Sequence, residues 1–97
     1  MVRNVVSSCG NTVPNQFLIE VDSGNKYFQS YQSVVACRRN GKYYVSQLWD
    51  YSRTTSKYLY RWFAQCGRSD LYDRNEVRKA IANGSIELVN VNSLQMI

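Results

Sequence analysis

Hydroxyl and cationic side chains are concentrated in residues 49–58, which read Trp-Asp-Tyr-Ser-Arg-Thr-Thr-Ser-Lys-Tyr. The segment lies where a strand pattern gives way to a helix pattern, and the first N–H groups of a helix lack partners and attract anions. Four hydroxyls of the segment can cap that helix: Ser52, Thr54, Thr55 and Ser56. Arg53 and Lys57 add positive charge at the same place. The segment is therefore either a structural corner or a site that binds a phosphate or carboxylate.

The structural role of this corner is the more common one, because helix starts select Ser, Thr and Asp for capping alone. Thr55 falls at the centre of the apolar face of the predicted helix, so we expect its hydroxyl to be buried and structural. Asp50 offers a further alternative, since its carboxylate can accept hydrogen bonds from the same N–H groups and occupy the anion site itself. We therefore rank the structural corner ahead of the anion site.

A second group of cations surrounds the Asn-Gly dipeptide at residues 40–41. This dipeptide is a strong hairpin signal, because a type I′ turn needs positive φ at both central residues. The turn places Arg39 opposite Lys42 and Arg38 opposite Tyr43, so the hairpin tip gathers cations and tyrosines. These side chains can enter a nucleic-acid groove or stack on bases. The alternative is that the cations only protect exposed strand ends from aggregation.

The net charge of +5 is unevenly distributed along the chain. Between residues 23 and 69, eight lysines and arginines stand against one acid, Asp50, which gives this stretch +7. The segments 1–22 and 70–97 each carry −1. A basic centre between weakly acidic ends predicts one basic face, which attracts nucleic acid or an acidic protein surface. The alternative is a charged surface that only maintains solubility.

Eight tyrosines are many for a chain of 97 residues, and we expect some of their hydroxyls to remain in contact with water. Tyr60 is expected on the polar face of its helix with Lys57 and Arg61, and tyrosine with arginine is typical of binding hot spots. We expect eight residues to contact nucleic acid or a partner: Arg38, Arg39, Lys42, Tyr44, Arg53, Lys57, Tyr60 and Arg61.

Catalytic and metal-binding patterns are missing from the sequence. Without histidine there is no Ser-His or Cys-His nucleophile pair and no mixed zinc site. Cys9, Cys37 and Cys66 are widely spaced and form no C-x-x-C pair, so we interpret them as small buried or half-buried hydrophobes rather than a disulfide framework or metal site. The seven acids are scattered, and no glycine-rich phosphate loop occurs. We expect no enzymatic activity, no cofactor and no metal.

The chain has no apolar run long enough to cross a bilayer, and its first residues are too polar for a secretion signal. We expect a cytoplasmic protein. Residues 1–15 contain Asn, Ser, Gly and the single proline, and they predict an irregular lead-in with at most a short strand at 2–6. Residues 16–97 are expected to form one domain.

The remaining pattern predicts an α+β domain with an antiparallel sheet. The expected elements are hairpins at 16–31 and 33–49, helices at about 54–66 and 74–83, and a terminal strand at 86–91. Residues 33–39 either form a separate strand or continue the preceding one through a kink near Gln32. Gly67 is expected to end the first helix, and Asp73 with Glu76 resembles the capping box of the second.

Residues 27–36, 41–45 and 49–58, with the tail at 83–92, resemble a recurring small domain of unknown function found mostly in phage and prophage proteins. The resemblance covers about residues 26–92, and its most specific part is the Trp-Asp-Tyr-Ser-x-Thr-Thr-Ser-Lys-Tyr signature. This chain departs from the pattern in an insert-like stretch near residues 68–72 and in its many arginines. The resemblance implies a viral accessory protein, a class that includes inhibitors of bacterial immunity such as anti-CRISPR proteins.

These observations predict a non-enzymatic, phage-type accessory protein that binds nucleic acid or a host nucleoprotein complex. One alternative is a protein–protein inhibitor of a host defence system, which would dock on an acidic host protein surface. Another is a virion or assembly component, in which a free sheet edge would support a homo-oligomer.

Overall fold

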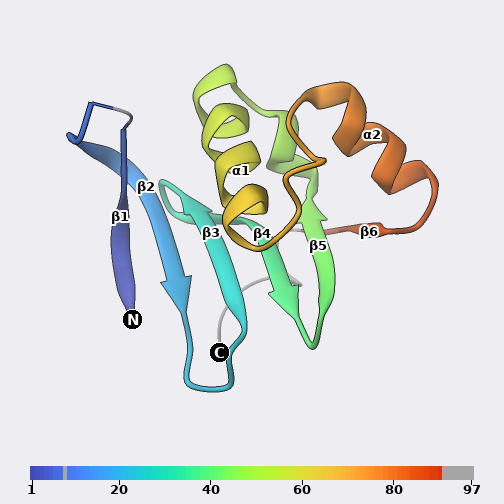
Figure 1. The fold of residues 1–97 in the computed structure, drawn as a ribbon, viewed down its shortest axis with the longest axis horizontal. Coiled ribbons are helices and arrows are strands. Elements are labelled where there is room, and N and C mark those ends of the chain that lie inside the picture. The colour runs from blue at the N-terminus through green and yellow to red at the C-terminus, as the bar shows by residue number, and fades with distance from the viewer. Residues whose placement is uncertain (8, 91–97) are drawn as a thin grey trace.

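A computed structural model describes residues 1–7 and 9–90. Its elements are β1 (Val2–Val6), β2 (Thr12–Glu20), β3 (Lys26–Ser30), β4 (Ser33–Arg39), β5 (Lys42–Ser46), the 3₁₀ turn η1 (Gln47–Asp50), α1 (Arg53–Gln65), α2 (Arg74–Ala82) and β6 (Ile86–Val89). The six strands of the described residues form one sheet in the order β1-β2-β3-β4-β5-β6 (Figure 1). The strands run antiparallel except for the parallel pair β5 and β6, so the predicted α+β class is confirmed.

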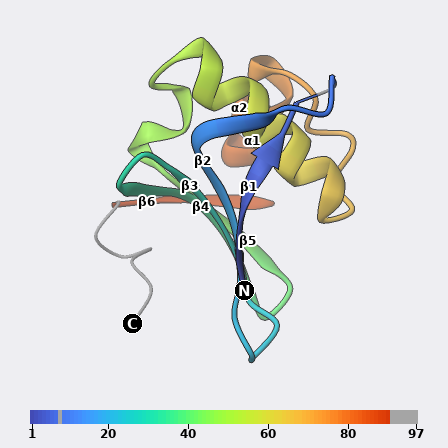
Figure 2. The same ribbon diagram turned by 90° about the vertical axis from the view of Figure 1, so that its left-hand side faces the viewer.

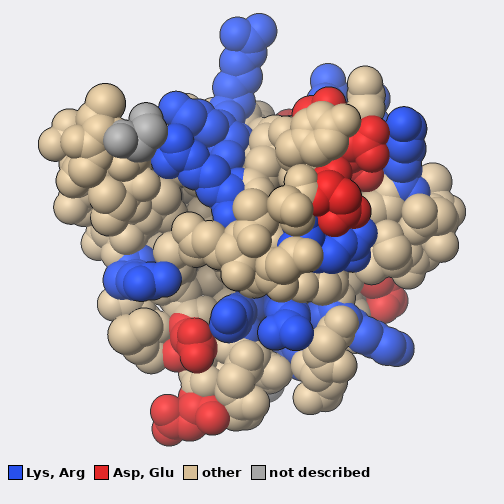
Figure 3. All heavy atoms as spheres, in the orientation of Figure 1, with Lys and Arg blue, Asp and Glu red and all other residues tan. Residues whose placement is uncertain are grey.

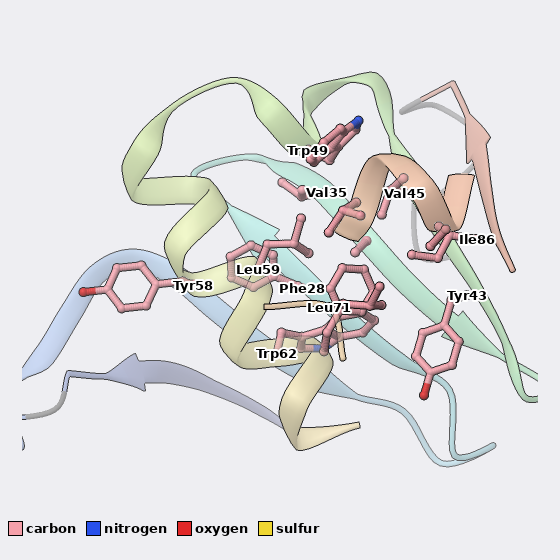
Figure 4. Close-up of a cluster of buried hydrophobic side chains, with 14 of the residues drawn as sticks. Phe28, Val35, Tyr43, Val45, Trp49, Tyr58, Leu59, Trp62, Leu71 and Ile86 are labelled. Atoms are coloured by element: carbon pink, nitrogen blue, oxygen red, sulfur yellow. The ribbon is translucent and has the colours of Figure 1, made fainter. Parts of the chain in front are cut away.

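Both helices cover one face of the sheet, as the turned view in Figure 2 shows. They also make the crossover that a parallel pair such as β5 and β6 requires. The main core lies between α1 and the sheet, where Phe28, Leu59 and Phe63 are fully buried. Figure 4 shows the labelled side chains of this cluster spread along the sheet, from Tyr58 on α1 to Ile86 near α2. The opposite face of the sheet carries a smaller cluster, in which Tyr27 and Cys37 are buried.

The short strand that the pattern allowed at residues 2–6 is confirmed as β1, but the irregular lead-in is wrong for residues 12–15, which already belong to β2. β1 pairs with β2 from Val2 opposite Ile19, and β2 already begins at Thr12. Pro14 lies in the stretch of β2 that precedes the first β3 pair at Gln16, where a missing N–H is tolerated. Backbone pairing with distant strands therefore overrides the turn-like composition of this segment.

The two hairpin turns next to β4 use left-handed backbone. Asn40 and Gly41 have φ of 53° and 79°, and the predicted pairs of Arg39 with Lys42 and Arg38 with Tyr43 are confirmed. Tyr31 has φ of 57° and reverses the chain between β3 and β4, so the alternative of one continuous kinked strand is wrong.

The ends of both helices carry the expected caps. Ser52 Oγ accepts from the N–H of Thr55 at 3.1 Å, and Asp73 Oδ1 accepts from the N–H of Glu76 at 2.9 Å. After α1, Gly67 adopts φ of 97°, and its N–H and the next one donate to the last carbonyls of the helix. β6 covers residues 86–89 of the expected strand 86–91, and residue 91 lies outside the described residues.

Candidate nucleic-acid interface

Four of the eight predicted site residues lie together in a cleft at the start of α1. Arg53, Lys57, Tyr60 and Arg61 form one side of this cleft, which has a volume of about 780 Å³ and is called the α1 cleft below. Ser56 of α1 lies on the same side, and the other lining residues come from η1, the junction before α1, the α1–α2 loop and the start of α2: Asp50, Tyr51, Ser52, Tyr72 and Arg74. Helical spacing brings the first set together, whereas the second set depends on the tertiary fold.

The other four predicted residues lie at the β4–β5 hairpin and on two different faces. Arg38 stacks over the ring of Tyr43, 5.9 Å from its centroid, on the side that faces the helices. Arg39 and Lys42 are paired across the hairpin, and Tyr44 packs on the small cluster of the opposite face. Figure 3 shows Lys and Arg spheres in separate groups rather than in one field. The prediction of a single basic face is therefore wrong, because adjacent strand residues point to opposite sides of a sheet.

Two cations of the α1 cleft, Lys57 and Arg61, are held in place by aromatic or backbone contacts. Lys57 Nζ lies 5.4 Å from the ring centroid of Tyr58, and Arg61 Cζ lies 5.3 Å from the same centroid. Arg61 Nη1 also donates to the carbonyl of Val6 at 3.3 Å. Among residues 1–7 and 9–90, no acid forms an ion pair with Arg53, Lys57 or Arg61. Their charges therefore remain available to an anionic ligand.

The single acid of the α1 cleft is engaged with another element. Asp50 Oδ2 lies 2.6 Å from Arg74 Nη2 and 3.9 Å from Arg78 Nη2. Ser52 rather than Asp50 caps α1, so the alternative in which Asp50 occupies the helix start is wrong. Because Asp50 is turned toward α2, its charge offsets the arginines of α2 more than the cations of α1.

Tyr60 contributes a neutral phenol to the α1 cleft. Its ring is half-buried, and this burial raises the pKa of the Tyr60 hydroxyl. The negative charges of Asp50 and Asp73 raise the pKa further, while a hydrogen bond to Ser56 opposes the shift. The hydroxyl therefore keeps its proton at physiological pH and can donate a hydrogen bond to an anion.

Three hydroxyls of the 49–58 corner have structural partners, as predicted. Ser52 caps α1, and Ser56 Oγ donates to the carbonyl of Trp49 at 3.2 Å. Thr55 is buried and shares a hydrogen bond of 3.0 Å with Ser30 Oγ. The hydroxyls thus fix the start of α1, and the cations and rings of the corner are the groups left to contact a ligand.

A second pocket adjoins the α1 cleft and was not anticipated from the sequence. This hydroxyl pocket has a volume of about 630 Å³ and is lined by Ser30, Tyr31, Ser33, Val35, Leu48, Tyr51, Ser52, Thr54 and Thr55. It shares Tyr51 and Ser52 with the α1 cleft, so the two hollows adjoin at a ridge that these two residues form. Sequence reasoning selected Tyr44 and Tyr60 but missed Tyr31, Tyr51 and Tyr72. These three tyrosines lie in turns and loops, outside the helices and strands. That placement was the signal that could have marked them as exposed candidates for the site.

The three cysteines differ in their exposure. Cys37 is buried and Cys66 half-buried as expected, whereas Cys9 is exposed, so the interpretation of all three as buried hydrophobes is wrong for Cys9. Burial raises the pKa of the Cys37 and Cys66 thiols. Within the described part of the chain, no three metal-ligating residues cluster, and neither helix has the length and apolarity that crossing a membrane requires.

Comparison with known families gives one match. A family model described as a family of unknown function (DUF8033) matches residues 2–80. No curated protein and no solved structure matches the chain. The match confirms a domain of unknown function, and it includes the first strand, which the expected range of about 26–92 left out.

Proposed function

The chain belongs to the family of unknown function DUF8033, and we propose that it is a non-enzymatic protein that binds nucleic acid at the α1 cleft. The observation that carries the proposal is the set of three cations, Arg53, Lys57 and Arg61, with no acid paired to them in the described residues. Phosphate groups are the ligands that such a set attracts most strongly. The family and the fold by themselves supply no function.

The surroundings of these cations favour phosphate contact over a merely solvated surface. Lys57 and Arg61 are oriented by the ring of Tyr58, so less side-chain entropy is lost when an anion binds. The Tyr60 hydroxyl adds a neutral donor beside them. The α1 cleft also gathers these cations along one side of a surface hollow, and a cluster of like charges attracts anions.

The hairpin cations are less suited to the same role. Arg38 is stacked on Tyr43, and the guanidinium of Arg39 is hydrogen-bonded to Tyr27 on the opposite face. Arg39 lies on the face of the sheet opposite the α1 cleft, and Arg38, although it faces the helices, does not line the α1 cleft. The α1 cleft is therefore the primary site of the proposal.

The face of the sheet opposite the helices, called the open face below, supports a second candidate function, that of a protein–protein inhibitor. Phe17, Val21 and Tyr44 are partly buried there, and Arg39 and Lys42 lie beside them. An apolar centre with a charged rim is the composition of protein interfaces. A phage-type accessory protein that blocks a host defence complex would use this face against an acidic surface, and a virion component would place a second copy there.

The test is nucleic-acid binding measured by fluorescence anisotropy at low and physiological salt, with single- and double-stranded DNA and RNA. We expect binding that weakens as salt rises, with a slope of log K against log salt of about −2 to −3 for three phosphate contacts. The charge reversal Arg53→Glu with Lys57→Glu should abolish binding and flatten the slope by about 2.

The matched control reverses two exposed cations outside the α1 cleft, Arg3→Glu with Lys42→Glu, and changes the net charge by the same amount. We expect this control to retain most of the affinity. Equal losses in both double variants would mean that net charge alone drives binding, which contradicts the proposed site. Absence of binding at low salt to every nucleic acid would overturn the function and leave the open face of the sheet as the next surface to examine.

A further inference from the structure

Three tyrosines project from the described surface with most of their area in water. Tyr31 is 61% exposed, Tyr51 77% and Tyr72 65%, and every other described aromatic side chain is buried or half-buried. A folded protein gains stability by covering tyrosine rings, so rings left exposed together indicate an interaction surface. None of the three contributes to the core, and their exposure needs another explanation.

All three exposed rings line the joined hollows beside α1. Tyr31 lines the hydroxyl pocket, Tyr72 lines the α1 cleft, and Tyr51 lies on the ridge that both share. The rings come from three separate segments: the β3–β4 turn, the junction before α1 and the α1–α2 loop. The fold therefore brings together three aromatic faces that lie far apart in the sequence.

The backbone that presents Tyr31 is fixed in an unusual conformation. Its φ of 57° is uncommon for a bulky residue. The Tyr31 N–H donates to the carbonyl of Asn15 at 2.6 Å, and Gln29 Nε2 donates to the Tyr31 carbonyl at 2.7 Å. Glycine or asparagine would adopt this positive φ at a lower conformational cost than tyrosine. The presence of tyrosine there is an observed strain that points to a role for its ring.

Cations and rings share this groove, with Arg53 and Lys57 in the α1 cleft beside Tyr51 and Tyr72. Aromatic rings interleaved with phosphate-directed cations are the features with which proteins hold single strands, because every unpaired base offers a π-face for stacking. A duplex keeps its bases stacked inside and would contact the cations alone. From this juxtaposition we propose that the ligand is a single-stranded nucleic acid whose bases stack on Tyr31, Tyr51 and Tyr72. This inference rests on the proposed function.

The first experiment compares ligands that share a phosphate chain but differ in available bases. The probes are labelled strands of about ten nucleotides, within the range that small single-strand sites cover: a thymidine strand, a uridine strand, an abasic strand of equal phosphate number, and a duplex. We expect the base-containing single strands to bind at least about fivefold more tightly than the abasic strand, the lower bound for one stacked base. The thymidine and uridine strands tell DNA from RNA, and tighter binding of either supports the inference.

The second experiment separates the ring of Tyr51 from its hydroxyl. Tyr51→Phe keeps the π-face and should retain affinity within about twofold, whereas Tyr51→Ala should lose about fivefold or more. Both changes are at an exposed residue and should leave folding intact. Leu88→Ala is the matched control, because this exposed apolar side chain on β6 lines neither hollow.

The outcomes distinguish this inference from the function on which it rests. Equal affinity for single, abasic and duplex probes, with an unchanged Tyr51→Ala variant, would overturn base stacking and leave phosphate binding in place. Absence of binding to all four probes would overturn both. A polyglutamate of equal charge that displaces the labelled strand more effectively than the unlabelled strand does would show that the bases add nothing, and would overturn the nucleic-acid inference.

Discussion

The buried hydroxyls beneath the start of α1 allow a sharp test of the packing through the substitution Thr55→Val. Ser30 Oγ accepts from Gln16 Nε2 at 3.0 Å and shares a hydrogen bond of 3.0 Å with Thr55 Oγ1. Ser52 Oγ donates to Thr55 Oγ1 at 3.1 Å. Valine keeps the branched shape of threonine but removes the hydroxyl. The variant therefore leaves Ser30, which is 6% exposed, without one of its two partners.

The expected loss of stability follows from these burials. A buried hydroxyl without its partner costs about 1–3 kcal/mol, and the extra buried methyl of valine offsets up to about 0.8 kcal/mol. Ser52 also loses an acceptor, but it is half-buried and can turn its hydroxyl to water. The net destabilisation of Thr55→Val is thus about 1–2 kcal/mol, which lowers Tm by about 5–15 °C for a domain of this size.

Thermal unfolding followed by circular dichroism measures the effect. Thr54→Val makes the same chemical change at the adjacent exposed residue and should stay within about 0.5 kcal/mol of the parent. A double-mutant cycle of Thr55→Val with Ser30→Ala should give a coupling energy of about 0.5 kcal/mol or more. A Thr55→Val variant as stable as the parent, or a coupling energy of zero, would refute the buried hydrogen bond as a source of stability.

Three further predictions concern the helix end, the thiols and pH. Gly67→Ala should cost about 1–2 kcal/mol in urea unfolding, because φ of 97° disfavours any Cβ, and Gly67→Asn should cost less. Cys9 should react with a thiol reagent at once, whereas Cys37, buried and with a raised pKa, should react only on unfolding; prompt labelling of Cys37 would contradict its placement. The hydrogen bond from Arg68 lowers the pKa of Asp70, so its contribution is present above the unfolded pKa and is lost as pH falls through the folded one. Asp70→Asn should therefore cost less than about 1 kcal/mol at neutral pH and nothing in acid, as measured by urea unfolding at both.

Local features of this chain were predictable because their causes are local. The Asn-Gly pair at 40–41 specified its turn and the register of the hairpin, since few other residues accept positive φ in succession. The apolar face of α1 followed from helical spacing, and Thr55, Leu59 and Phe63 are buried on it. The alternation of strand side chains could also have separated Arg38 from Arg39, although the clustering of charge along the sequence favoured one face.

Features that depend on distant pairing were not predictable in the same way. β1 and the start of β2 form because they pair with each other, and β3 holds β2 in place on its other side from Gln16 onward; no local composition records these pairings. At the β3–β4 pairing a register shift places both Val35 and Ala36 in the core beneath α1, against the simple alternation of a strand. Such irregularities are determined by how the helices pack on the whole sheet.

Local preferences within the sequence specified the α+β class, the hairpin at residues 40–41, the Asp73 cap of α2 and the helical row of Arg53, Lys57, Tyr60 and Arg61, while Ser52 was one of four candidate caps for α1. Each of these depends on φ preferences, capping or periodicity within a few residues. Only the tertiary structure decided which cations share a surface with which rings. Tyr31, Tyr51 and Tyr72 meet beside α1 because strand pairing and helix packing bring a turn, a junction and a loop to the same end of the sheet.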